Sequence, residues 1–251
     1  MLRVPRVGPV SRVGPVPCVS AVIGTVVFLA ALLSGCESDP DASGRLPEAS
    51  SILRTAAQTS RGLHSGHFDI SVNGRLPGVN VESAKGALTR RDDGKVDAKG
   101  TAKVQQFGQL LEMEFVLIDP SVYIKGPTGG FSKAPASMVT NVYDPSVLLD
   151  DKRGIANLLS NLRRARTEGR ETVSDVETVR VGGTLAKDKV APIVPGIQSD
   201  VEAKFWLSEG KSREPVRAWF QLPPQRKGSG ARMIEVSLSK LNEPVTVRAP
   251  K

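Results

Sequence analysis

The chain has 251 residues, of which 34 are lysine or arginine and 26 are aspartate or glutamate, so its formal net charge is +8. Aromatic residues make up 4% of the chain, which leaves few rings for bases to stack on, so we do not expect a nucleic-acid-binding protein. With two cysteines the chain is not a small disulfide-stapled fold either, and its stability must come from a hydrophobic core.

The first 35 residues have the features of a bacterial lipoprotein signal peptide. Three arginines precede an uncharged apolar run, Val19–Leu33, which is shorter than the ~20 residues that a membrane-spanning helix needs. The run ends in L-S-G-C, the pattern that predicts cleavage before Cys36 and acylation of that cysteine. The alternative, an ordinary secretory signal, leaves Cys36 as a lone exposed thiol. Cleavage removes three arginines and no acid, so the net charge falls from +8 to +5.

A tether and a helix follow the predicted cleavage site. Residues 36–46 are polar and broken by proline and glycine, which predicts a flexible link from the lipidated Cys36 to one domain over residues 47–251. From Glu48 to Arg61 the apolar residues fall on one side, and Gly62 follows. This pattern predicts an amphipathic helix that packs on the domain.

Strand patterns occupy the next part of the chain, beginning with the alternation of Phe68, Ile70 and Val72 and continuing through Val79–Arg90. The stretch K-V-D-A-K-G-T-A-K-V, Lys95–Val104, alternates charged or polar residues with small apolar ones. Tight turns between these runs predict antiparallel neighbours. The residues expected to face the core from this strand and the next are Val96, Ala98, Gly100, Ala102, Leu111, Met113, Phe115 and Leu117.

The inward face of Lys95–Val104 is unusually small, since a strand that covers a core generally presents larger apolar side chains. Two explanations are open for Ala98, Gly100 and Ala102. A helix or another backbone packs closely over them, or they border an apolar cavity.

The middle of the chain predicts two helices. Tyr143–Asp150 begins with aspartate before proline, which is typical of a capped short helix. In the second helix, four apolar residues recur at helical spacing, namely Ile155, Leu158, Leu159 and Leu162. Arg163, Arg164 and Arg166 come next, and we expect them to lie in solvent at the end of that helix, where the helix dipole favours a cation. The alternative is a site for anionic lipid headgroups.

Strand patterns return after residue 170, so the chain is strand-rich with a few separate helices, which indicates the α+β class. An antiparallel sheet of about ten strands coils and becomes concave on one side. Amphipathic helices are expected to cover that side.

Four stretches resemble the mycobacterial lipoprotein family named for LppX, LprA, LprF and LprG. They are G-L-H-S-G-H-F-D-I-S-V-N-G-R-L-P-G-V, Y-D-P-S-V-L-L-D-D-K-R-G-I-A-N-L-L-S-N-L, E-G-R-E-T-V-S-D-V-E-T-V-R-V-G-G and S-L-S-K-L-N-E-P-V-T-V, which together span most of the chain after Cys36. The resemblance implies a strongly curved, half-barrel-like antiparallel sheet with helices over its concave face, enclosing an apolar cavity that binds acylated lipids or glycolipids.

Acylation of Cys36 predicts a lipid-anchored protein on the outer face of the cell membrane. LprG-type members are further implied to work beside a major-facilitator-type transporter in lipid export. The implied cavity lining is positional: the inward sheet residues and the four apolar helix residues given above. The run R-R-A-R, Arg163–Arg166, departs from the family pattern because it is more basic than that segment is expected to be.

Nothing in the sequence indicates an enzyme or a cofactor. His64 and His67 have no cysteine or acidic pair beside them to complete a zinc site, and no G-x-S-x-G motif is present for a lipase. Two functions of different class are therefore weighed, a membrane-anchored lipid carrier and a structural or adhesive surface lipoprotein with a solid core. A lipase or esterase is a distant third.

Overall fold

The computed structural model of the chain describes residues 41–74, 80–106, 108–140, 144–194, 197–224 and 232–250. These residues belong to one compact unit, Ser38–Lys251. The predicted signal peptide and Cys36 lie outside the described residues.

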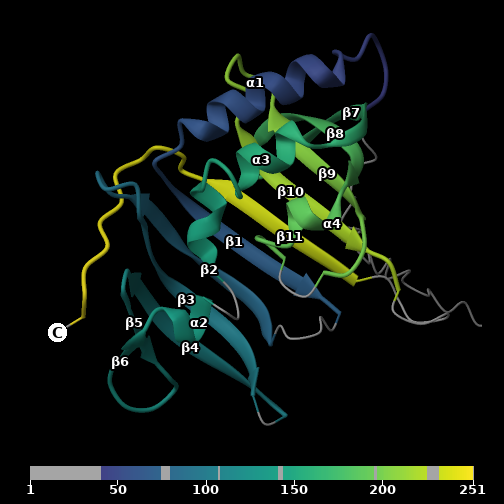
Figure 1. The fold of residues 1–251 in the computed structure, drawn as a ribbon. Helices are drawn as coiled ribbons and strands as arrows, with labels where there is room; N and C mark the ends of the chain where they lie inside the picture. Colours follow the sequence, from purple (N-terminus) through teal and green to yellow (C-terminus); the bar gives the residue numbers. More distant parts are fainter. Residues whose placement is uncertain are drawn as a thin grey trace, which may run out of the picture. The chain divides into compact units, whose positions relative to one another are not determined.

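Within the described residues, eleven strands form one antiparallel sheet in the order β6-β5-β4-β3-β2-β1-β11-β10-β9-β8-β7 (Figure 1). The strands are β1 Ser65–Asn73, β2 Val81–Arg90, β3 Val96–Gln106, β4 Gln109–Ile118, β5 Ser121–Lys125, β6 Ser132–Pro135, β7 Arg163–Val173, β8 Val176–Leu185, β9 Val201–Ser208, β10 Pro215–Leu222 and β11 Arg232–Ser239. The α+β class and the antiparallel sheet agree with the sequence pattern.

The sheet consists of two arms, each a meander of consecutive strands. We call β1–β6 the first arm and β7–β11 the second arm. The arms join where β1 pairs with β11, with Phe68 opposite Leu238 and Ile70 opposite Val236. The first and last strands of the sequence are therefore neighbours in the middle of the sheet.

Helices cover one face of the curved sheet, the concave face (Figure 1). They are α1 Ala49–Arg61, α2 Ser137–Thr140, the 3₁₀ helix η1 Pro145–Leu149, α3 Ile155–Ser160 and α4 Lys187–Val190. The long helix α1 packs against α3 above the second arm, whereas η1 contacts β2 and β3 of the first arm. The helix predicted over Glu48–Arg61 is confirmed. Glu48 caps it, because its carboxylate accepts hydrogen bonds from the backbone N–H groups of Ser50 and Ser51.

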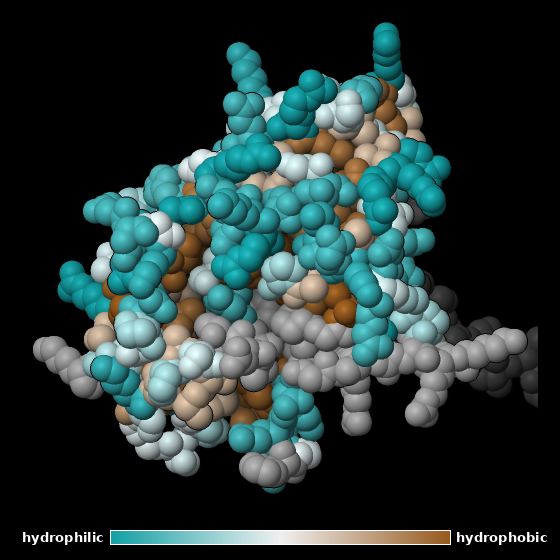
Figure 2. All heavy atoms as spheres, in the orientation of Figure 1, coloured by the Kyte–Doolittle hydropathy of each residue, from teal (hydrophilic) through white to brown (hydrophobic). Residues whose placement is uncertain are grey.

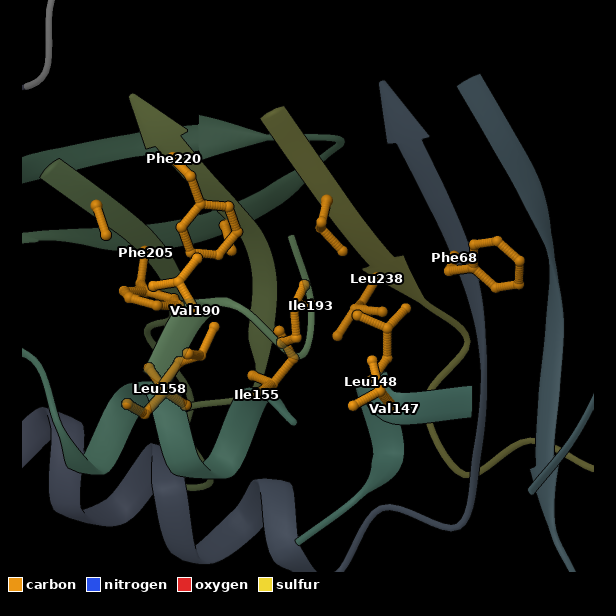
Figure 3. Packing of buried hydrophobic residues seen from close by; sticks show 14 of the residues in the cluster. Phe68, Val147, Leu148, Ile155, Leu158, Val190, Ile193, Phe205, Phe220 and Leu238 are labelled. Carbon is orange, nitrogen blue, oxygen red and sulfur yellow. The ribbon is translucent and has the colours of Figure 1, made fainter. Parts of the chain in front are cut away.

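The core beneath the helices centres on two phenylalanines of the second arm. Phe205 in β9 and Phe220 in β10 are fully buried and meet edge to face, with ring centroids 6.1 Å apart. Figure 3 shows Ile155 and Leu158 of α3 reaching toward these rings, with Val190 between them. The helices thus fill the space above the second arm with their own side chains.

The opposite, convex face of the second arm carries a second, smaller apolar cluster. Arg180, Trp206 and Arg217 lie directly opposite one another on β8, β9 and β10. Both guanidinium groups stack on the indole of Trp206, 5.9 and 5.7 Å from its ring centre. This cross-strand stack shields Trp206, which is only 8% exposed.

The predicted helix end at Arg163, Arg164 and Arg166 is wrong. Helix α3 ends at Ser160, and the three arginines begin the edge strand β7. Pairing with β8 decides the local structure here, which the helical spacing of the preceding apolar residues did not reveal. Arg164 has φ = 52°, and the register with β8 shifts between Arg163 and Arg166, so the edge strand is bulged at this cluster.

Candidate functional site

The concave face of the first arm presents the sheet residues that the sequence predicted to face inward. Strands β3 and β4 pair so that these residues lie opposite one another: Ala98 with Leu117, Gly100 with Phe115, and Ala102 with Met113. The predicted side chains therefore share one face of the sheet, as the alternation indicated.

Burial differs along this face. Ala98 and Leu117 are 0% and 6% exposed and belong to the core, whereas the remaining predicted residues are half-buried. The half-buried ones are Val96, Gly100, Ala102, Leu111, Met113 and Phe115. Figure 2 shows apolar side chains at the bottom of a hollow over this arm, between polar ones. The helices therefore leave part of the apolar face of the first arm uncovered.

Close packing accounts for two of the three small residues on β3. Ala98 is fully buried on a strand that contacts η1. Gly100 lies opposite Gly86 of β2, and a Cβ added to Gly100 would come within 2.1 Å of the Lys85 carbonyl oxygen. A side chain is excluded there by the neighbouring backbone, not by an alkyl chain. Ala102, which is half-buried, is the small residue that remains open to the cavity interpretation.

The four predicted helix residues lie apart from this surface. Ile155, Leu158 and Leu159 are at most 1% exposed and pack into the core above the second arm, as Figure 3 shows for the first two. Leu162 lies beyond the end of α3 and is half-buried. The predicted lining is thus divided between a densely packed helix group and an open sheet group.

A pocket of about 600 Å³ adjoins the open sheet group, where the β2–β3 turn meets η1 and the loop after it. Val96 and Leu117, two predicted residues, line it together with Ala136. Beside it lies the short helix α2, whose Met138 is 68% exposed. The sequence analysis missed α2, because four residues are too few to show a helical period.

Charged side chains of both signs form the rim of this pocket. Arg90 donates hydrogen bonds to the Leu149 carbonyl oxygen and to Asp151, the latter at 3.0 Å, and so ties β2 to the loop after η1. Lys95 Nζ lies 2.6 Å from Asp119, and this carboxylate raises the pKa of Lys95.

Asp150 forms the other strong pair of the rim. Its carboxylate accepts two hydrogen bonds from the Arg153 guanidinium, at 2.9 and 2.7 Å. Burial raises the pKa of Asp150, but the hydrogen bonds from Arg153 and from the backbone of Lys152 and Arg153 outweigh it, so that the pKa is lowered overall. Lys152 and Asp144 also line the pocket. The rim therefore offers both hydrogen-bond donors and acceptors above an apolar floor.

A second pocket, of about 480 Å³, lies between α1 and the segment that joins α3 to β7. Leu159 and Leu162, both predicted as lining, contribute to it with Leu53, Ala57 and Ala165. The residues of α1 were missed as candidates, although the one-sided apolar pattern of Glu48–Arg61 was the signal that could have found them.

The two histidines of the chain do not lie together with other potential metal ligands in the described part of the structure. His64 is exposed at the junction between α1 and β1, and His67 is half-buried in β1. Within the described ranges, no three His, Cys, Asp or Glu side chains gather as a metal site. Among the helices of the same part of the chain, none is long and apolar enough to span a bilayer.

The sequence is similar to a family of lipoproteins and to named members of it. Residues 48–247 match the sequence profile of the LppX_LprAFG lipoprotein family. The chain is 34% identical over 235 residues to the lipoarabinomannan carrier protein LprG of Mycolicibacterium hassiacum. The alignment covers 92% of this chain and 97% of the relative. It is 30% identical over 234 residues to the protein of the same name in Mycobacterium tuberculosis. That alignment covers 92% of this chain and 94% of the relative.

Two solved structures share the fold. LprF from Mycobacterium bovis superposes with a TM-score of 0.71 at 26% identity, covering 82% of this chain and 98% of that one. LppX from M. tuberculosis superposes with a TM-score of 0.59 at 22% identity, covering 80% and 98%. The open, curved antiparallel sheet is thus shared with both proteins.

Proposed function

Because the chain belongs to the LppX_LprAFG lipoprotein family, we propose that it is a membrane-anchored carrier that binds acylated lipids or glycolipids on the concave face of the first arm. It is not an enzyme in this proposal: it holds the lipid and moves it through the cell envelope. Cys36 carries the acyl chains that keep it on the outer face of the membrane.

The observation that carries the proposal is the half-buried apolar surface of β3 and β4, which continues into the pocket beside Val96 and Leu117. Alkyl chains laid on such a surface gain at most about 0.8 kcal/mol for each methylene removed from water. Fifteen methylenes therefore provide roughly 12 kcal/mol before the cost of ordering the chain is subtracted. An apolar lining with few polar contacts is sufficient to hold a lipid.

The charged rim suits a polar headgroup. The named relatives are lipoarabinomannan carrier proteins. A glycolipid carries sugar hydroxyls on its headgroup beside its acyl chains. Sugar hydroxyls both donate and accept hydrogen bonds, and the rim combines Arg90, Lys95 and Arg153 with Asp119 and Asp144. We therefore assign the headgroup of a carried glycolipid to this rim.

The test is the lipid content of the purified protein. A chain of residues 36–251 with Cys36→Ala keeps the whole described core, which begins at Ala49. We expect mass spectrometry of its organic extract to show acylated lipids in near-stoichiometric amount. Ala102→Trp should fill the open surface and abolish the lipid signal while the domain still folds. Thr101→Trp adds the same bulk on the convex face and should leave the lipid load unchanged.

A structural or adhesive lipoprotein is the second candidate, because the second arm is densely packed, with Leu158, Phe205 and Phe220 fully buried. That function predicts an empty extract and no difference between the two tryptophan variants. An empty extract, or an Ala102→Trp variant that keeps its full lipid load, would count against the carrier. A major-facilitator-type transporter is proposed as the partner that receives or supplies the lipid, and crosslinking in intact cells would test it.

A further inference from the structure

Two exposed arginines of α1 line the groove between α1 and β7, and two more lie on the edge strand β7 beside it. Arg54 and Arg61 of α1 line the groove, and Arg164 and Arg166 flank Ala165, which lines its other wall. All four arginines are exposed. We call these four residues the arginine face.

No salt bridge among the described residues neutralises the arginine face, although Arg54 adds to the capping hydrogen bonds in lowering the pKa of Glu48. Among the described residues, Arg54, Arg164 and Arg166 have no ion-pair partner, and Arg61 donates to the neutral Ser160 hydroxyl at 3.0 Å. Glu48 is the acid that lines the groove, and its carboxylate is engaged in capping α1. The rim of the first pocket differs, because Arg90, Lys95 and Arg153 each pair there with an aspartate.

The arginine face lies near the point where the chain leaves for its anchor. Asp41 and Arg170 of β7 exchange two backbone hydrogen bonds, at 2.7 and 2.8 Å. The Thr167 hydroxyl donates to the Pro47 carbonyl oxygen at 2.7 Å, which also fastens the start of the domain to β7. Four residues lie between Cys36 and Asp41. The five steps from one Cα atom to the next span at most about 18 Å when the chain is fully extended. An acylated Cys36 therefore holds the β7 edge close to the lipid surface.

The edge itself is unsuited to pairing with a protein strand. Its register with β8 shifts between Arg163 and Arg166 and again between Thr167 and Gly169. Arg164 has a positive φ in the first of these irregularities. Bulges and exposed charge at a sheet edge oppose strand addition, whereas arginine side chains reach phosphate oxygens readily.

From this we infer that the arginine face docks on the anionic headgroups of the membrane that holds the Cys36 anchor. The inference rests on the proposed anchoring and goes beyond it, since the anchor alone leaves the domain free to turn. Docking turns the α1–β7 groove, with its apolar floor of Leu53, Leu159 and Leu162, toward the bilayer surface.

The experiment measures the binding of the non-acylated chain, residues 36–251 with Cys36→Ala, to lipid vesicles. We expect the chain to cosediment with phosphatidylcholine vesicles that contain about 30% phosphatidylglycerol, and not with vesicles of phosphatidylcholine alone. Binding to the anionic vesicles should weaken at high salt. Each basic residue near such a surface changes the affinity roughly five-fold, so Arg54→Gln, Arg164→Gln and Arg166→Gln together should lower it on the order of 100-fold.

A matched control removes the same charge elsewhere. Lys85, Lys103 and Lys133 are exposed on the first arm, away from the groove, and changing all three to glutamine should alter binding by less than about two-fold. The single variant Arg166→Glu serves if the triple variant folds poorly. It should also weaken vesicle binding, and its melting temperature shows whether it is folded.

Equal loss in the two triple variants would overturn the docking face, because net charge alone would then explain binding. Binding to neutral vesicles, or no binding to anionic ones, would overturn it as well. The lipid extract of the arginine variant separates the two proposals: a full lipid load with lost vesicle binding supports docking as a separate property. A full lipid load in the non-acylated chain with all its arginines, together with no vesicle binding, refutes docking and leaves the carrier proposal intact.

Discussion

The two arms of the sheet have the same antiparallel construction but different covers. In the second arm, inward residues such as Val181, Phe205 and Phe220 are fully buried beneath α3 and α4. In the first arm, Ala102, Met113 and Phe115 face the same way and stay half-buried, although η1 packs on β2 and β3. The domain thus places its own side chains over one arm and leaves apolar surface on the other.

The difference indicates that the two arms of the sheet have different roles. The dense arm contributes the edge-to-face pair of Phe205 and Phe220 and, on its convex side, the Arg180–Trp206–Arg217 stack. The open arm bears the apolar surface proposed for the lipid.

The largest expected contrast comes from shortening one phenylalanine in each arm. Phe220→Ala should lower the free energy of unfolding by about 3–5 kcal/mol, because it leaves a cavity in a packed core. Phe115→Ala removes a half-buried ring and should cost less than half as much. Urea unfolding of both variants gives the comparison. Equal costs would mean that the first arm is packed as tightly as the second.

Removal of the bound lipid should destabilise the two arms unequally. Its effect on the free energy of unfolding should be smaller than that of Phe220→Ala. Bound lipid at 100 times its dissociation constant stabilises the fold by about 2.7 kcal/mol. After extraction, we expect the backbone amides of β3 and β4 to exchange hydrogen faster, while those of β9 and β10 change little. Hydrogen exchange followed by mass spectrometry resolves the strands. A uniform change over both arms would argue against a lipid seated on the first.

The smallest effect is expected at Asp97, on the convex side of β3. Burial raises the pKa of this carboxyl, and Arg91, whose Nε is 3.6 Å away, offsets part of that rise. A raised folded pKa means that ionisation destabilises the fold, so the cost is fully present at pH 7 and disappears as the pH falls below about 3.9. Asp97→Asn should therefore raise the melting temperature slightly at pH 7 and not at pH 3.5.

The control for that pH dependence is Asp69→Asn, which removes a charge from an exposed position on β1. It should leave the melting temperature nearly unchanged at both pH values. A lower melting temperature for Asp97→Asn at pH 7 would show that the pair with Arg91 outweighs the cost of burial.

Sequence patterns predicted much of this fold because they report which way a side chain faces. Alternation placed Ala98, Ala102 and Phe115 on one face, and the one-sided pattern of Glu48–Arg61 predicted α1. Alternation does not report what lies above a residue. The cover over β3 comes from η1, some 50 residues later in the chain.

The same limit explains one question that the sequence left open, at Gly100, and one wrong prediction, at Arg163–Arg166. Gly100 is small because Gly86 faces it across β2 and β3, and no local pattern encodes that cross-strand approach. Arg163 and its neighbours continue a helical spacing in the sequence, but pairing with β8 makes them a strand. In both cases the partner strand decides the outcome, and its register is a tertiary property.

The pairing of β1 with β11 also sets the order in which the domain is completed. Phe68 meets Leu238 about 170 positions later in the chain, whereas every other strand pair joins consecutive strands. Local hairpins close quickly, and a contact across such a separation forms slowly. During synthesis the first arm has its hairpins long before β11 emerges, and until then β1 and β10 are both unpaired edges. A chain truncated before Arg232 would keep those two edges permanently, and we expect it to aggregate.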